Sequence, residues 1–286
     1  MKNIFSLICL CIALGALVYY ITHYKKPVNF DTSLQVKKYK NHLNDQWSRY
    51  ALPIFQKLYE QNNLASIKKN SVIKIPKKIH QIWLGSSFPE KYRAWQHSWI
   101  HHHPDWEYIL WTEESLKDLP MFNREMYEAA CNYGEKSDIA RYEILNMYGG
   151  LYVDTDFECL QSCDIFSYYD FYIGIQPLDT NMLQLGTGLI ACAPGHALIR
   201  ALIEYLPQQK HIQQIIAKTG PLYATRVFCA RALQSPGKIC AFPPTFFYPC
   251  GYNQNTRDKK SWIKPESYAI HHWAGSWLSK DAFVKE

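Results

Sequence analysis

The segment SDIARYEILNMYGGLYVDTDFE, residues 137–158, constrains the fold more than any other part of the chain. Its first part has the composition of a helix, because Ser137 suits an N-cap and Asp138 suits the first turn. Gly149 and Gly150 are residues that commonly end a helix. The apolar residues that follow are typical of a buried strand. A helix that leads directly into a strand predicts a sheet with α/β organisation.

Three carboxylates come at the end of this strand, at alternate positions: Asp154, Asp156 and Glu158. Because strand side chains alternate with period two, the sequence predicts that all three share one face. Like charges repel, so a cation, a metal ion or water must hold at least two of them. Ligands of open α/β sheets bind beyond the carboxyl ends of the strands, and paired Asp oxygens suit Mg²⁺ or Mn²⁺. The alternative is an acidic surface cluster on a structural α/β domain.

The rest of the chain alternates in the same way. We expect strands at 79–84, 106–111, 170–175 and 187–192. We expect one helix between Gly85 and about residue 103. Further helices are expected at 113–118, 122–132, 195–206 and 221–234. This order predicts a largely parallel sheet within one domain, residues 73–286.

The basic charge lies at the front of the chain. Residues 1–80 hold 13 Lys and Arg against 3 Asp and Glu, whereas the remainder holds 18 against 22. This distribution argues against a core that binds nucleic acid. A basic stem over residues 25–72, partly helical, would suit anionic lipid headgroups, and a solvated linker is the alternative.

An uncharged apolar run from Ile4 to Ile21 is about long enough to span a bilayer. We predict a retained single membrane anchor over residues 1–24, with a cleaved signal peptide as the alternative. The flanking lysines would place the domain in the cytoplasm by the positive-inside rule. Long domains translocate largely regardless of flanking charge, so the side of the membrane stays open. Cysteine usage does not settle the compartment, because Cys159/Cys163 and Cys240/Cys250 suit either local disulfides or buried thiols.

Two further groups of residues are candidates for chemistry. Asp138 and Arg141 are three apart on the predicted helix and share a face, as a surface ion pair or as part of a site. His271 and His272, in the segment HHWAGSW, offer an imidazole as a third metal ligand. Neither a glycine-rich phosphate loop nor a Ser-His-Asp or Cys-His nucleophile arrangement stands out in the sequence.

These motifs together resemble glycosyltransferase family 32. The motifs are KIHQIWLG (78–85), the segment 137–158, TGP (219–221) and HHWAGSW (271–277). The family includes yeast initiating α-1,6-mannosyltransferases and inositol phosphorylceramide mannosyltransferases, and it is similar to the sugar-binding region of clostridial glucosylating toxins. The resemblance implies a GT-A (Rossmann-like) nucleotide-sugar-binding fold and a UDP- or GDP-hexose donor. It also implies a divalent cation, usually Mn²⁺ with Mg²⁺ as the alternative, retention at the anomeric carbon and a glycan or lipid acceptor. For a eukaryotic protein it implies a single N-terminal anchor with the domain in the Golgi lumen, which conflicts with the placement that the flanking lysines indicate.

The resemblance also assigns roles. Trp83, with Ile82 beside it, would stack on the nucleotide base, and Ser276 with Trp277 would close over the diphosphate. Donor-sugar and ribose contacts would come from Ser137, Asp138, Arg141, Tyr152 and Asp154. The predicted catalytic residues are Asp138, Arg141, Asp154 and Asp156, and the predicted metal ligands are Asp154, Asp156 and His272, with His271 as the alternative histidine.

One departure from the family concerns the strand after the DTD triplet. Family members commonly have an Asn there, whereas this chain has Gly186 and Thr187, which leaves the identity of the donor sugar open. The predicted anchor and the resemblance together imply a membrane-anchored, metal-dependent, retaining hexosyltransferase. The alternatives are a nucleotide-sugar hydrolase and a non-catalytic sugar-binding protein on the same fold.

Overall fold

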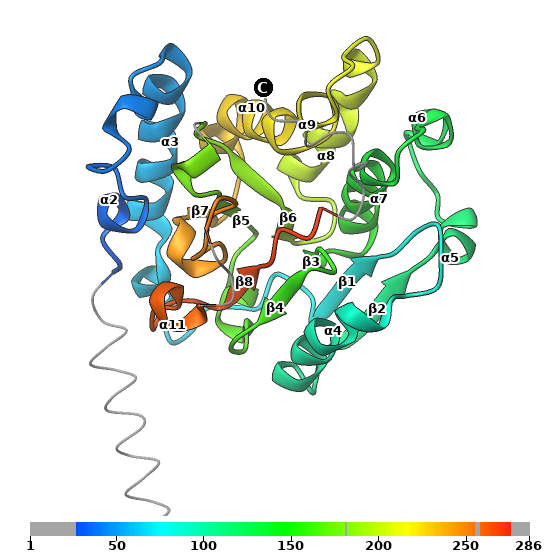
Figure 1. Ribbon diagram of the computed structural model, residues 1–286, viewed down its shortest axis with the longest axis horizontal. Coiled ribbons are helices and arrows are strands. Elements are labelled where there is room, and N and C mark those ends of the chain that lie inside the picture. Colours follow the sequence, from blue (N-terminus) through cyan, green and yellow to red (C-terminus); the bar gives the residue numbers. More distant parts are fainter. Residues whose placement is uncertain (1–26, 181, 255–257, 276–286) are drawn as a thin grey trace, which may run out of the picture.

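A mixed central sheet organises the protein, which the computed structural model describes over residues 27–180, 182–254 and 258–275 (Figure 1). Within these residues the sheet has the strand order β2-β1-β3-β6-β5-β7. Its strands are β1 Lys78–Ile82, β2 Glu107–Trp111, β3 Gly150–Val153, β5 Phe171–Ile175, β6 Leu185–Cys192 and β7 Ile239–Phe242. Only β6 runs antiparallel to its neighbours. The predicted α/β class with a largely parallel sheet is confirmed.

A second, two-stranded antiparallel sheet lies beside the first and pairs β4 with β8. These strands are β4 Phe157–Cys159 and β8 Ala269–His271. Because β4 begins just after the DTD triplet, Asp154 and Asp156 lie in a turn between two strands rather than on one continuous strand. The prediction of a single strand face that carries all three carboxylates is therefore wrong.

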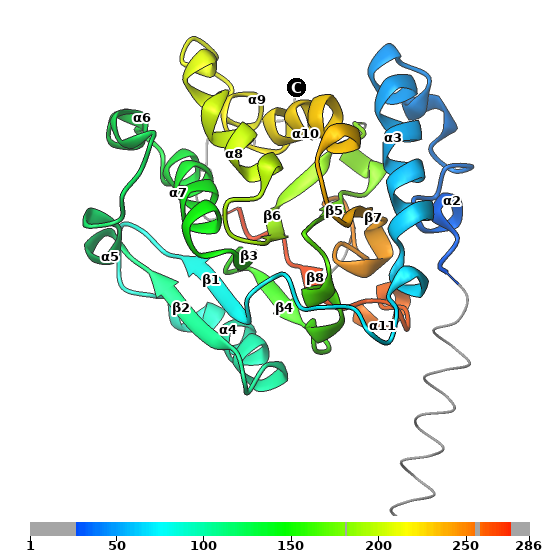
Figure 2. The same cartoon turned by 180° about the vertical axis from the view of Figure 1, so that it is seen from behind.

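Helices cover the sheet and its edges. They are α2 Phe30–Ser33, α3 Gln46–Asn62, α4 Glu90–His102, α5 Glu113–Lys117, α6 Arg124–Ala129, α7 Tyr133–Tyr148, α8 Ala197–Glu204, α9 Ile215–Lys218, α10 Pro221–Arg231 and α11 Lys259–Trp262. Figures 1 and 2 show α7, α8 and α10 side by side, whereas α3 lies at the β7 edge of the sheet.

Helix α7 begins earlier than the sequence predicts. Its N-cap is Asn132, whose side-chain oxygen accepts a hydrogen bond of 2.7 Å from the Gly134 amide. Ser137 therefore lies inside the helix, and the expected N-cap there is wrong because an earlier Asn already satisfies the first free amides. The C-terminal prediction is confirmed: Gly149 has φ 61°, and its amide donates to the Leu145 carbonyl at 2.9 Å.

The basic front of the chain contributes to the core. Asp45 caps α3 by accepting a hydrogen bond of 3.0 Å from the Ser48 amide. The buried face of α3 includes Ala51, Phe55 and Tyr59, which join the same hydrophobic cluster as the sheet. Residues 46–62 thus pack on the domain rather than standing apart from it as a stem. The predicted anchor lies outside the described residues, among which no helix has the length and apolarity needed to cross a membrane.

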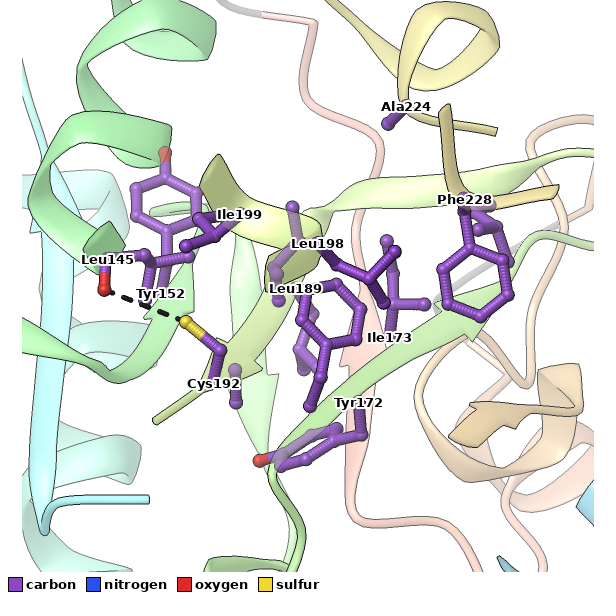
Figure 3. Close-up of a cluster of buried hydrophobic side chains, with 14 of the residues drawn as sticks. Leu145, Tyr152, Tyr172, Ile173, Leu189, Cys192, Leu198, Ile199, Ala224 and Phe228 are labelled. Carbon is purple, nitrogen blue, oxygen red and sulfur yellow. Dashed lines mark hydrogen bonds between the residues drawn. The ribbon is translucent and has the colours of Figure 1, made fainter. Parts of the chain in front are cut away.

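A tightly packed core joins α7, α8 and α10 to the sheet (Figure 3). Leu189 and Ile173 of adjacent strands meet Leu198 of α8 and Phe228 of α10, and all four are buried. Each such side chain stabilises the fold by about 2 kcal/mol. Cys192 is also buried there, and its thiol donates weakly to the Leu145 carbonyl. The seven described cysteines are free, so the Cys159/Cys163 and Cys240/Cys250 pairs are thiols in this structure.

Candidate active site

A cavity of about 550 Å³ opens at one edge of the sheet, a size typical of small-molecule sites. Strands β1, β3 and β5 are parallel, so their carboxyl ends meet there, and the antiparallel β6 starts at the same edge. The cavity is lined by these predicted residues: Ile82, Trp83, Ser137, Asp138, Arg141, Tyr152, Asp154 and Asp156. Ser276 and Trp277 lie outside the described residues.

Each of the three alternating carboxylates has its own partner. Asp154 Oδ1 accepts a hydrogen bond of 2.7 Å from the Tyr152 hydroxyl and lies 3.3 Å from Arg141. Asp156 and Glu158 each face a histidine, His271 and His272 respectively. The repulsion expected from the sequence is thus relieved by different partners at each carboxylate.

Arg141 is the centre of a buried charge network and is only 4% exposed. Its guanidinium lies 3.2 Å from Asp138 Oδ1, donates to the Thr187 carbonyl at 2.6 Å, and covers the face of the Tyr152 ring. Burial opposes its charge, but the nearby carboxylates of Asp154 and Asp138 raise its pKa overall. Arg141 therefore stays protonated and holds both carboxylates at the cavity wall.

Asp138 is 6% exposed and accepts a hydrogen bond of 2.9 Å from the Thr219 hydroxyl. Burial raises the pKa of Asp138 to about 6, although Arg141 favours the ionised form. Thr219 belongs to the TGP motif, so the contact joins two motifs that are 81 positions apart. Asp138 can accept a hydroxyl hydrogen bond from a ligand when it is ionised.

Asp156 is held from two sides. Its Oδ1 lies 3.1 Å from His271 Nε2, and its Oδ2 accepts a hydrogen bond of 2.8 Å from the Ala274 amide. Burial disfavours its charge, but His271 and the backbone amides lower the pKa of Asp156 overall. Asp156 is therefore ionised at neutral pH.

The two consecutive histidines have different surroundings. His272 Nε2 lies 2.9 Å from Glu158 Oε2, and the His272 ring stacks on Trp95 at 4.2 Å between ring centroids. His271 instead joins Asp154 and Asp156, and their potential ligand atoms all lie within 4.8 Å of one another. The geometry thus favours His271 over the predicted His272, because neighbouring residues at the end of strand β8 point in opposite directions.

This group of residues fits a divalent cation. Two carboxylates offer the hard oxygen ligands that Mn²⁺ and Mg²⁺ prefer, and imidazole is acceptable to Mn²⁺. Within the described residues, His271 Nδ1 is buried without a hydrogen-bond partner. His271 therefore has binding capacity that the protein itself does not satisfy.

Glycines in β6 make room for the site. A Cβ atom added at Gly188 would lie 2.7 Å from Asp154 Oδ2, and one added at Gly186 would lie 2.1 Å from the Tyr248 hydroxyl oxygen. Both distances are too short for real atoms. The segment LGTGL therefore needs glycine at both positions, a requirement that depends on residues far away in the sequence.

Sequence reasoning missed several cavity residues, among them Gln176, Gln184, Tyr248, Tyr252 and Trp273. Glutamine and tyrosine carry no motif by themselves, so no sequence signal marks them. Trp273 lies in the segment HHWAGSW, where its backbone φ of 52°, unusual for a bulky residue, becomes apparent only in the structure.

Comparison with known proteins shows what the DTD segment is. Residues 89–172 match the family described as the glycosyltransferase sugar-binding region containing a DXD motif. The chain carries a glycosyltransferase DXD region. Asp154, Thr155 and Asp156 supply the DXD triplet. The resemblance to glycosyltransferase family 32 is thereby confirmed.

Relatives of the DXD region include yeast enzymes. Inositol phosphoceramide mannosyltransferase 3 of Schizosaccharomyces pombe is 32% identical over 227 residues, which cover 73% of this chain and 62% of that protein. Mannosyl phosphorylinositol ceramide synthase SUR1 of Saccharomyces cerevisiae is 28% identical over 169 residues, covering 54% of this chain and 42% of that protein. The chain thus spans about three fifths of the length of the first relative.

Among solved structures, the PaToxG glycosyltransferase superposes on this chain with a TM-score of 0.45 at 19% identity. The superposition covers 63% of this chain and 76% of that one.

Proposed function

We propose that this protein is a metal-dependent, retaining glycosyltransferase of GT-A type that transfers a hexose from a nucleotide-sugar donor to a glycan or lipid acceptor. The observation that carries the proposal is the convergence of Asp154, Asp156 and His271 within 4.8 Å at the end of β3. They line the same cavity as Trp83 and Arg141. This combination offers a cation site, an aromatic ring and a fixed positive charge to one ligand.

The donor would extend along the sheet edge from β1 to β3. Trp83 would stack on the base, with Ile82 beside it, since both residues line the cavity at the carboxyl end of β1. The Trp83 indole is oriented by a hydrogen bond of 3.2 Å to Ser86 Oγ. Asp138 and Arg141, with Ser137 nearby, would bind hydroxyl groups of the donor sugar.

Asp154, Asp156 and His271 would hold the cation. A bound Mn²⁺ or Mg²⁺ would neutralise charge on the departing diphosphate. Ser276 and Trp277, outside the described residues, remain our proposed contacts to that diphosphate. His272, which faces Glu158, would support the site by fixing the neighbouring residue His271.

The residues of the chain would act by positioning and by electrostatics. Arg141 and the Tyr152 hydroxyl hold Asp154, and His271 with the Ala274 amide holds Asp156. Both carboxylates are thus engaged, and we assign no protein nucleophile. The bond between the anomeric carbon and the phosphate oxygen would break while the acceptor oxygen bonds on the same face. The acceptor proton would pass to a phosphate oxygen.

The relatives suggest which sugar and acceptor to test first. Their names describe mannosyl transfer to inositol phosphoceramide. We therefore propose a GDP- or UDP-hexose donor, with mannose as the first sugar to test, and a membrane lipid as the acceptor class. Anchoring by residues 1–24 would bring the cavity close to such an acceptor. Flotation with lipid vesicles tests this anchoring: the full chain should float with the vesicles, and a chain that begins at residue 27 should not.

Donor hydrolysis is the experiment that tests the proposed function. The protein is offered each common UDP- and GDP-sugar with Mn²⁺ or with a chelator, alongside Asp156→Asn and the control Asp105→Asn, whose carboxylate is exposed. We expect metal-dependent release of sugar from one donor, lost in Asp156→Asn and kept in the control. Folded protein that neither binds nor hydrolyses a donor would contradict the proposal. Hydrolysis that no acceptor accelerates would indicate a nucleotide-sugar hydrolase instead.

A further inference from the structure

The sheet order separates two ends of the cavity. Trp83 follows β1 and Asp154 follows β3, whereas Gln184 precedes β6 and Gln176 follows β5. Because the strands are ordered β1-β3-β6-β5, the two glutamines lie on the far side of the aspartates from Trp83. If the nucleotide binds at Trp83, the glutamine end faces away from it.

The two glutamines form a buried amide pair. The side-chain Gln184 Nε2 donates to Gln176 Oε1 at 2.7 Å, and the backbone amide of Gln176 donates to the backbone carbonyl of Gln184 at 2.9 Å. Their side chains line the cavity, although the residues are only 7% and 8% exposed. Among the described residues, the Gln184 Oε1 atom has no hydrogen-bond partner. A buried amide oxygen without a donor costs about 1–3 kcal/mol, so a small rotation of the Gln184 side chain that lets this oxygen accept a hydrogen bond from a ligand hydroxyl in the cavity would remove that cost.

Aromatic rings stand next to this amide pair. Tyr248 packs on Gly174 and Gly186, each of which lies two residues from a glutamine and on the same strand face. Trp273 contacts the Tyr248 ring at 6.0 Å between centroids, and Tyr252 meets Trp273 edge-on at 5.9 Å. Polar amides and aromatic rings therefore converge at this end of the cavity.

The ring arrangement is built into the backbone. Trp273 has φ 52°, a strained conformation for a bulky residue, and its indole donates to the Cys250 carbonyl at 3.0 Å. The loop that carries Tyr252 is tied to the β5–β6 connection, because the Asn253 amide donates to Asp179 Oδ2 at 2.9 Å. These contacts fix the rings beside the glutamines before any ligand binds.

We propose that Gln176, Gln184, Tyr252 and Trp273 form the acceptor subsite, and that the acceptor presents a polyhydroxylated six-membered ring to it. This inference rests on the proposed function, which places the donor at the opposite end. The ring's hydroxyl groups match the amide oxygen and nitrogen atoms, and its apolar C–H face matches an aromatic surface. A hexopyranose and a cyclitol both have this chemistry.

The test measures binding of a free ring to the full chain in detergent, by ligand-observed NMR. One arm uses methyl α-D-mannopyranoside and the other uses myo-inositol. The variants are Gln184→Leu and Tyr252→Ala. Their matched controls are Gln61→Leu and Tyr50→Ala, which replace an exposed glutamine and a tyrosine of similar exposure on α3. Donor hydrolysis is measured on the same samples.

We expect the wild type and both controls to bind at least one ring, and both variants to bind it about tenfold more weakly. The arm that binds distinguishes a sugar acceptor from a cyclitol headgroup. Equal binding by the variants and the controls, or no ring binding by the wild type, would overturn the subsite even if donor hydrolysis is present. Ring binding that is lost in the variants would support the subsite even if no donor is hydrolysed, in which case only the proposed function fails.

Discussion

His271 and Asp156 are 115 positions apart in the chain, yet His271 Nε2 lies 3.1 Å from Asp156 Oδ1. The pairing of β4 with β8 brings them together, because it aligns His271 with Phe157, the residue after Asp156. The next residue, His272, reaches Glu158 instead. One short strand pair thus distributes two consecutive histidines over two carboxylates.

This arrangement predicts different effects for the two histidines on Mn²⁺ binding. His271→Ala should weaken Mn²⁺ by more than about tenfold because it removes a ligand atom, and Asp156→Asn should weaken it further. His272→Ala should have a smaller effect, since its imidazole contacts Glu158 and Trp95. Calorimetric titration with Mn²⁺ measures these affinities, and exposed His101 provides the control His101→Ala. A greater loss in His272→Ala than in His271→Ala would contradict the assignment.

Gly188→Ala should weaken Mn²⁺ binding as well as lower the stability of the fold. The added Cβ would meet Asp154 Oδ2 at 2.7 Å and the Phe157 ring at 2.9 Å, so Asp154 must move. We expect about 1–3 kcal/mol lower unfolding free energy together with weaker Mn²⁺ binding. Gly195→Ala is the comparison, because nothing lies within 4 Å of its Cβ and only its φ of +62° opposes the change. If Gly188→Ala and Gly195→Ala both bind Mn²⁺ with the affinity of the wild type, the close contact between residue 188 and Asp154 does not affect the cation site.

Arg141→Met should destabilise the protein by about 3–5 kcal/mol, because it leaves Asp138 and Asp154 without their shared cation. Adding Asp138→Asn should recover part of this loss by removing one buried charge. Urea unfolding measures the difference. Arg93→Met, at an exposed ion pair with Glu90, should change the unfolding free energy by less than about 1 kcal/mol. Equal losses of unfolding free energy in Arg141→Met and Arg93→Met would show that the Arg141 network is not stabilising.

The pH dependence of stability should reveal Asp138. Its pKa is raised from 3.8 to about 6 by burial, so the folded state binds a proton more tightly than the unfolded state. The unfolding free energy should therefore fall as pH rises from about 4 to about 6, by on the order of 3 kcal/mol from this group. Asp138→Asn should flatten that interval. Asp156, whose pKa is lowered, acts in the opposite sense and only below about pH 4.

Unfolding in the absence of metal and donor, measured at steps between pH 4 and pH 7, tests this expectation. Asp105→Asn serves as the control, since its carboxylate is exposed and should leave the profile unchanged. Identical profiles for the wild type and Asp138→Asn would contradict a raised pKa at Asp138.

Much of the fold was predictable because its elements are marked by local residues. The glycine pair after Tyr148 ends α7, and the apolar run that follows forms β3 as expected. The start of α7 was not predictable in the same way, since Asn132 and Ser137 are both good N-caps and only one is used. The packing of α3 was also unexpected, because its Lys-rich surroundings conceal a regular buried stripe that includes Ala51 and Phe55.

The residues of the site also fall into those that local sequence identifies and those that only the fold brings together. Asp138, Arg141, Asp154 and Asp156 were identifiable because they stand at fixed local spacings around one helix–strand junction. The choice of His271 over His272 depends on the register of β8 against β4, which only the folded chain specifies. Gln176 and Gln184 are neutral residues without a motif, and their pairing follows from the antiparallel contact of β5 with β6.

The sequence by itself determined the α/β class, the DXD region and the carboxylates that offer cation ligands. Those features are local, since they depend on hydrophobic periodicity and on residues within one turn or strand of each other. The tertiary structure decided which partner neutralises each carboxylate and which residues surround the cavity beyond the motif. Some of these contacts join residues more than a hundred positions apart, as for His271 and Asp156, and no local pattern encodes the strand register that creates them.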